Sequence, residues 1–294
     1  MASEKSIVNL LQQRAKDTKT KIKVAYVLGK LKNKIPGNMQ GKVIEKLLKF
    51  SSDENAKVRY ASVFALKSLY EGFSANEREK INERLYDLCT DKNKGVLLNV
   101  KEFIKKLNFE SRIAEKILIL SKSPYPRRRS KAIAIFKNTR TLIPRGLIDE
   151  VTKSTSKLCS DELLVVRMAA VKEIKYDSGV LVNTQEKLTN VLLNACSDRR
   201  WIVRYNAVKA ICSQRDNFHG EILNKIFEIL LNLCSYEKWE VRFSAVNSIA
   251  RMKYVIPYGV RDKIILKISQ VSKKDTNRIV KESAKTALER LQKI

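Results

Sequence analysis

The apolar positions of this chain follow a helical pattern that recurs from one end to the other. Stretches such as "GKVIEKLLKFSS" from Gly41 and "NKIFEILLNLCS" from Asn224 place apolar residues three and four positions apart, which puts them on one face of a helix. A second amphipathic stretch follows each, as "DENAKVRYASVFAL" follows at Asp53. One such hairpin cannot bury its own apolar face. The recurrence therefore predicts hairpins that stack and share a core.

The second stretch of each hairpin can be numbered from a common origin, with index zero at Asp53. Val58 then lies at +5 and Arg59 at +6, and small residues dominate at +9 and +12. We expect the Asp or Ser at index zero to be the N-cap of the second helix. The third frame lacks the basic residue at +6, and the fourth matches least. Eight frames fill the chain, and they start near residues 17, 53, 91, 123, 161, 198, 236 and 275.

The Asp at zero, Val at +5, Arg at +6 and small residues at +9 and +12 resemble the HEAT-repeat family over essentially the whole chain. The resemblance implies an all-α fold, a right-handed α-solenoid (superhelix) of about eight HEAT-like helical hairpins. It implies that the second helices line the concave side, and that the protein is a scaffold for proteins, RNA or DNA. No linker-like stretch divides the chain, so we expect a single domain over residues 1–294.

Charge adds a preference for partners. The 294 residues include 59 Lys and Arg against 31 Asp and Glu, a net charge of +28 that is spread along the chain. Such a field favours polyanions: nucleic acid, an anionic membrane surface or an acidic protein. The alternative is a lysine-rich, solvated surface without a polyanionic partner.

Basic side chains recur at positions that should point away from the core. If +5, +9, +12 and +16 face inward, then +3, +7, +11 and +14 face the opposite way. Equivalent positions in stacked hairpins lie about 10 Å apart, a spacing that suits a phosphate backbone. A second concentration, Arg127, Arg128 and Arg129, lies at a predicted helix start, where the helix dipole disfavours cations and favours an anion. The rows contain Lys67, Lys105, Lys137 and Lys175 at +14, and Lys172 and Lys209 at +11.

The only two tryptophans occupy the same position in adjacent frames. Trp201 and Trp239 lie at +3, and Tyr205 and Phe243 follow one turn later at +7. These rings should form one aromatic patch across two stacked helices, with Arg200, Lys209 and Lys238 around it, and Tyr60 and Phe64 form a smaller version. Aromatic rings among cations are what base stacking uses. The alternative is that the tryptophans pack between repeats.

Little in the sequence indicates catalysis or a cofactor. His219 is the only histidine, and the five cysteines form no CxxC, so we expect no metal, no cofactor and reduced, buried thiols. The chain also resembles HEAT-like DNA glycosylases in size, basicity and tryptophans. That resemblance implies an Asp one turn after a cleft Trp, where this chain has Tyr205 and Phe243.

These observations favour a non-enzymatic HEAT-repeat module that binds nucleic acid through a basic concave face. A scaffold for an acidic protein partner is the second reading, and a glycosylase-like enzyme for alkylated DNA the third. No stretch is apolar enough to insert into a membrane. We expect an intracellular, cytoplasmic protein, or a nuclear one if its source is eukaryotic.

Overall fold

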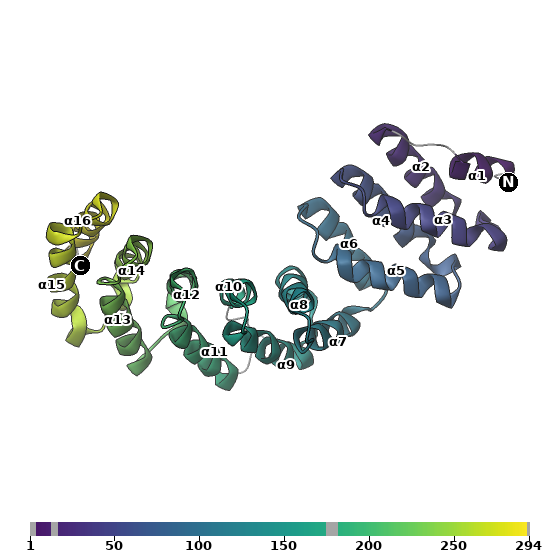
Figure 1. Ribbon diagram of the computed structural model, residues 1–294. Helices are drawn as coiled ribbons and strands as arrows, with labels where there is room; N and C mark the ends of the chain where they lie inside the picture. Colours follow the sequence, from purple (N-terminus) through teal and green to yellow (C-terminus); the bar gives the residue numbers. More distant parts are fainter. Residues whose placement is uncertain (1–3, 13–16, 175–181, 293–294) are drawn as a thin grey trace. The chain divides into compact units, whose positions relative to one another are not determined.

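The protein is an all-α solenoid built from helical hairpins (Figure 1). The computed structural model describes residues 4–12, 17–174 and 182–292, and within them the regular structure is entirely helical. The prediction of eight hairpins is confirmed, with the even-numbered helices as their second members. The α-helices are α1 (Glu4–Gln12), α2 (Thr18–Leu31), α3 (Gly37–Phe50), α4 (Ala56–Leu69), α5 (Ala75–Leu88), α6 (Lys94–Lys106), α7 (Glu110–Ser121), α8 (Pro126–Thr139), α9 (Arg145–Ser156), α10 (Leu164–Glu173), α11 (Val182–Ala195), α12 (Trp201–Ser213), α13 (Glu221–Leu233), α14 (Trp239–Arg251), α15 (Arg261–Lys274) and α16 (Arg278–Gln292).

The helices group into two compact units. Unit 1 comprises Met1–Ile117 and Ala134–Pro144, and unit 2 comprises Leu118–Ile133 and Arg145–Ile294. In unit 2 the second helices α10, α12, α14 and α16 pack on one another in one row, and α9, α11, α13 and α15 form the other row (Figure 1). In unit 1, α2, α4 and α6 pack in the same way. That residues 1–294 form one domain stays a prediction.

The core lies between the two rows, and the repeat frame locates it. At +5, six valines are completely buried, and the small residues at +9 and +12 are buried where the second helices meet. This confirms the inward face predicted from the sequence. The fourth frame departs from the rule, because its +5 residue, Arg128, is exposed. The buried valines are Val58, Val96, Val166, Val203, Val241 and Val280.

The start of the second helix corrects one prediction. Only Asp17 is an N-cap, accepting a hydrogen bond from the amide of Thr20. In the other frames the helix begins at +3, and the residue at +2 is the N-cap, as Asn55 is for α4 and Asn93 for α6. The aspartate at zero instead accepts from the amide at +2 and so closes the turn. The origin assigned to the first frame is therefore two residues too late.

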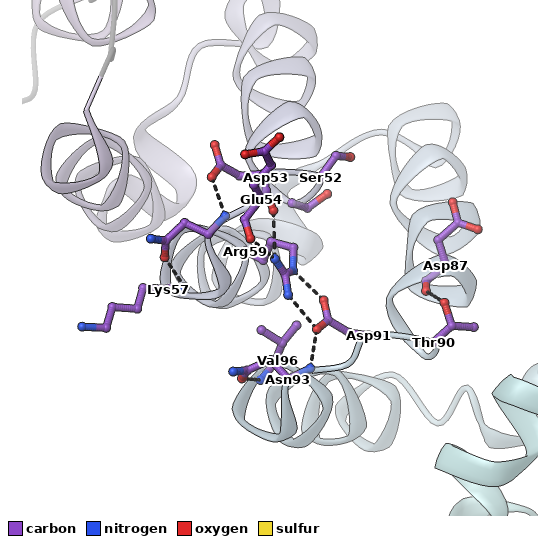
Figure 2. A network of polar contacts seen from close by, with 12 residues as sticks. Ser52, Asp53, Glu54, Lys57, Arg59, Asp87, Thr90, Asp91, Asn93 and Val96 are labelled. Atoms are coloured by element: carbon purple, nitrogen blue, oxygen red, sulfur yellow. Dashed lines mark hydrogen bonds and ion pairs between the residues drawn. The ribbon is translucent and has the colours of Figure 1, made fainter.

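The same carboxylate at index zero also forms an ion pair with the +6 arginine of the preceding repeat. In Figure 2, Arg59 reaches from α4 to Asp91, with Nε–Oδ2 and Nη2–Oδ1 distances of 2.6 and 2.9 Å. Its Nη1 also donates to the carbonyl oxygens of Asp53 and Glu54 in its own turn. The same bidentate ion pair joins Arg129 to Asp161, Arg167 to Asp198 and Arg242 to Asp275. We call these pairs the rungs.

The exceptions to the pattern follow from the same geometry. Tyr236 replaces aspartate at index zero, and the guanidinium of Arg204 lies over its ring, 4.3 Å from the centroid. In the corrected first frame Lys21 lies at +6, and it pairs with Asp53 at 2.6 Å. Between the third and fourth frames, Leu97 replaces the arginine at +6 and Ser123 replaces its aspartate partner at index zero. Both members of this rung are therefore absent.

The rungs change the titration of their acids. Burial by itself would raise the pKa of Asp91, but hydrogen bonds from Arg59 and from the Asn93 amide outweigh it and hold that pKa below its usual value. The same balance lowers the pKa of Asp161 and Asp275. The carboxylates of Asp91, Asp161 and Asp275 are therefore ionised at neutral pH.

The cysteines also follow the repeat. All five are buried and none is in a disulfide, and four occupy index −2, at the end of a first helix. Burial raises the pKa of Cys196 and Cys234 to about 12, so both thiols stay protonated. They act as small core residues, as the sequence predicted. The four are Cys89, Cys159, Cys196 and Cys234.

Candidate nucleic-acid interface

The two tryptophan-bearing helices of unit 2 enclose an open surface hollow of about 400 Å³. We call it the α12–α14 hollow. Its walls include the +7 and +11 residues of both helices, which the repeat frame predicted to point away from the core. None of the described residues that line it carries a carboxylate. The lining consists of Tyr205, Lys209, Cys212, Ser213, Phe243, Ser244, Asn247, Ser248 and Arg251.

The aromatic rings at this site are accessible. Trp239 is 36% exposed, and Trp201, Tyr205 and Phe243 are half-buried. The Trp239 and Phe243 rings lie edge to face, 6.4 Å apart at 64°. Complete burial of both tryptophans would have excluded base stacking, and neither is completely buried.

Cations surround the rings. The ammonium of Lys209 lies over the Tyr205 ring, 5.2 Å from its centroid, and is exposed. Arg251 lines the same hollow and is exposed. Arg251 was not among the sequence candidates because it lies at +15, one position beyond the +14 row. Arg200 and Lys238 are the exposed N-cap residues of α12 and α14.

The lysines of the predicted +14 and +11 rows have different environments. Lys67 on α4 forms an ion pair with Glu102 at 2.9 Å. Lys105 on α6, Lys137 on α8 and Lys172 on α10 have exposed side chains. Lys175 lies outside the described residues. Of these basic rows, only Lys209 lines the α12–α14 hollow.

The three consecutive arginines have separate environments. Arg127 and Arg128 are exposed, whereas Arg129 is buried and forms a rung with Asp161, a further ion pair with Glu162 at 3.2 Å, and bonds to two backbone carbonyls. Its donors already have protein acceptors, so we leave Arg129 out of the proposed phosphate contacts. The sequence signal for this role was present, since Arg129 lies at +6.

Unit 1 contains a smaller hollow of about 290 Å³ between α2 and α4, lined in part by Tyr26, Tyr60 and Lys57. Tyr60 and Phe64 are 39% and 36% exposed. The rings of Tyr26 and Phe64 lie 5.5 Å apart, and Lys67 lies over Phe64. Sequence reasoning found Tyr60 and Phe64 but missed Tyr26, because the first frame was set two residues late.

Other kinds of site are not evident in the described part of the chain. No three His, Cys, Asp or Glu side chains there are grouped as metal ligands would be. Among the same residues, every helix is too short or too polar to cross a bilayer.

Comparison with known proteins agrees with the repeat. Residues 43–73, which contain α4 and Arg59, match the HEAT repeat, which confirms the resemblance drawn from the sequence. No curated protein matches the chain.

The chain matches 301 chains of solved structures. One is an engineered protein with 15% sequence identity and a TM-score of 0.51, and the match covers 97% of this chain and 87% of that one. Another comes from a structure of Kap95p with RanGDP, described in terms of nuclear import complex assembly. It shares 14% identity and a TM-score of 0.62, and the match covers 99% of this chain and 42% of that one. At these identities the likeness shows the fold alone.

Proposed function

We propose that this all-α solenoid, with a HEAT repeat at residues 43–73, is a binding scaffold whose α12–α14 hollow binds nucleic acid. The observation that carries the proposal is the hollow itself. It combines partly exposed aromatic rings with two exposed cations, Lys209 and Arg251, and its described lining has no acidic side chain.

Each part of the hollow has a task in this proposal. Tyr205 in the hollow and Trp239, which lies next to it against the Phe243 ring, offer ring surface to unpaired bases, and stacking on an aromatic side chain contributes about 1–3 kcal/mol per base. Lys209 and Arg251 neutralise phosphates and release their counterions, so affinity falls as salt rises. Because stacked bases must be unpaired, single strands should bind more tightly than duplexes of the same length.

The test is fluorescence anisotropy with labelled single- and double-stranded DNA and RNA of equal length over a range of salt concentrations. The two tryptophans of the chain lie at the starts of α12 and α14, the helices that form the hollow, so their intrinsic fluorescence is a second probe of binding there. The variants are Lys209→Glu and Arg251→Glu. The matched control is Lys225→Glu, an exposed lysine on the first helix α13 of the same unit.

We expect each hollow variant to weaken binding. The slope of log affinity against log salt concentration should fall by about the contribution of one phosphate contact, and the control should change little. Tryptophan quenching should accompany binding. If no oligonucleotide binds at low salt, or if the control weakens binding as much as the hollow variants, the proposal is refuted and the charge of +28 is a general surface property.

A further inference from the structure

A patch of exposed apolar side chains lies at the start of two neighbouring helices in unit 2. Tyr125 precedes α8 and is 62% exposed, whereas Leu163 and Val165 lie at the start of α10 and are 42% and 64% exposed. We call these three residues the α8–α10 patch. It is formed by other residues than the α12–α14 hollow, and the inference does not depend on the nucleic-acid proposal.

A rung holds the patch together. The Arg129 guanidinium binds Asp161, and the Arg129 amide donates to the carbonyl oxygen of Tyr125. Asp161 in turn accepts from the amide of Leu163 at 3.0 Å. Tyr125 and Leu163 thus flank one buried ion pair, and Val165 follows in the first turn of α10.

These residue types are unusual for their positions. At +2, where the patch has Tyr125 and Leu163, three other frames have the polar N-cap Asn55, Asn93 or Asn277. Buried apolar residues at these positions would be ordinary core residues, but the three residues of the patch are between 42% and 64% exposed. Clustered exposed apolar groups with a charged rim are typical of an interaction surface.

The rim of the patch is cationic. Arg128, at a position that is a buried valine in six other frames, is exposed and stacks on the Tyr125 ring at 5.2 Å. Arg199, also exposed, donates to the carbonyl oxygen of Glu162 at 3.2 Å and so lies next to Leu163. Two acidic residues, Asp161 and Glu162, adjoin Leu163, and both form ion pairs with Arg129.

We propose that the α8–α10 patch binds an acidic protein segment that carries large apolar side chains. Leu163 and Val165 are aliphatic, so they offer a nucleic acid neither hydrogen bonds nor a ring for stacking. Covering Leu163 and Val165 with apolar side chains of a peptide would be favourable, because it removes apolar surface from water. The arginines on the rim, together with the positive end of α10, complement carboxylates on the same segment.

The experiment selects binders without assuming their sequence. Random 12-residue peptides displayed on phage are panned on the immobilised full chain and depleted on the variant Leu163→Ser/Val165→Ser. Enriched peptides are then synthesised with a fluorescent label and titrated by anisotropy. Circular dichroism checks that the variants fold, which is expected because the replaced side chains are exposed.

We expect the enriched peptides to combine Asp or Glu with Leu, Ile, Phe or Trp. The double serine variant and Arg128→Glu should each lower their affinity roughly tenfold or more. The control Lys209→Glu should leave peptide affinity unchanged, while it still tests the nucleic-acid proposal separately.

Three results would overturn the inference: no enrichment over the depleting variant, enriched peptides without acidic residues, or peptide affinity that depends on Lys209 and not on Arg128. If the double serine variant weakens oligonucleotide binding and no peptide is selected, the patch belongs to a nucleic-acid surface instead.

Discussion

Replacing the arginine of one rung should lower the free energy of unfolding much more than replacing the equivalent arginine of the adjacent repeat, which forms no rung. Arg242 and Arg204 both lie at +6, in adjacent repeats of unit 2. Arg242 donates to both carboxylate oxygens of Asp275 at 2.7 Å, whereas Arg204 lies over the ring of Tyr236. Arg242 also donates to two backbone carbonyls of its own turn, and Arg204 donates to one. The main difference between the two arginines is therefore the ion pair.

The size of the difference follows from what each change leaves behind. Arg242→Met leaves Asp275, whose side chain is 4% exposed, with only the Asn277 amide as a donor. Leaving a buried charge without its partner costs about 3 kcal/mol. Arg204→Met leaves no charge behind, and it loses a cation–π contact of about 1 kcal/mol. We therefore expect Arg242→Met to lower the free energy of unfolding by about 2 kcal/mol more.

The assay is urea unfolding at pH 7, followed by the fluorescence of Trp201 and Trp239. Both probes lie in the two helices that carry the changes, so they report on this part of the array even if the whole chain does not unfold in one step. Asp275→Asn completes a double-mutant cycle with Arg242→Met. Equal losses for the two methionine variants, or a coupling energy near zero in the cycle, would show that the rung does not stabilise the repeat in this way.

Three further outcomes follow from the structure. Because Asp91, Asp161 and Asp275 have pKa values below their unfolded values of about 3.9, the rungs should stabilise the protein above that pH and lose this contribution as pH falls through the folded pKa values; an acid titration of the unfolding free energy checks this. Gly29→Ala should destabilise unit 1 by about 1–3 kcal/mol, since the new Cβ would lie 2.9 Å from the Ala65 Cα. The control Gly41→Ala, with its nearest atom at 3.7 Å, should be neutral or stabilising by up to about 1 kcal/mol in the same urea assay. Iodoacetamide should modify none of the five cysteines of the folded protein at pH 8 and all of them in urea, as mass spectrometry would show, because all five are buried.

The repeat frame was readable because it reflects two physical requirements of stacked hairpins. Small residues at +9 and +12 let neighbouring second helices approach, and valine at +5 fills the space between the rows. Both leave a periodic signal in one sequence. The inward and outward faces could be predicted from that signal, and with them the position of Trp201, Tyr205, Trp239 and Phe243 on an accessible face.

The sequence was less informative about charged residues, since an arginine or lysine is buried in an ion pair at one position and exposed at another. The guanidinium of Arg129 is used in a rung, whereas its neighbours Arg127 and Arg128 are exposed. Lys67 is paired across the repeat with Glu102. The acidic partners of Arg129 and Lys67 lie more than 30 positions away in the sequence, so a local pattern does not reveal them.

The rungs show how such distant pairs could have been found. Arg59, Arg129, Arg167 and Arg242 precede their aspartates by 31 to 33 residues. Where the partner at index zero is a tyrosine, the arginine stacks on it, and where the partner is Ser123, the +6 residue is Leu97. The identities at +6 and at the next index zero thus change together along the chain. An arginine at +6 that faces an aspartate one repeat later is therefore a structural cation, and it should be set aside from the 59 lysines and arginines before a basic surface is sought, although the net charge of +28 is unchanged because each rung is neutral. Among the cations that remain, Lys209 and Arg251 line the α12–α14 hollow, and Arg128 and Arg199 lie beside exposed apolar side chains, and these are where we propose that the two partners bind.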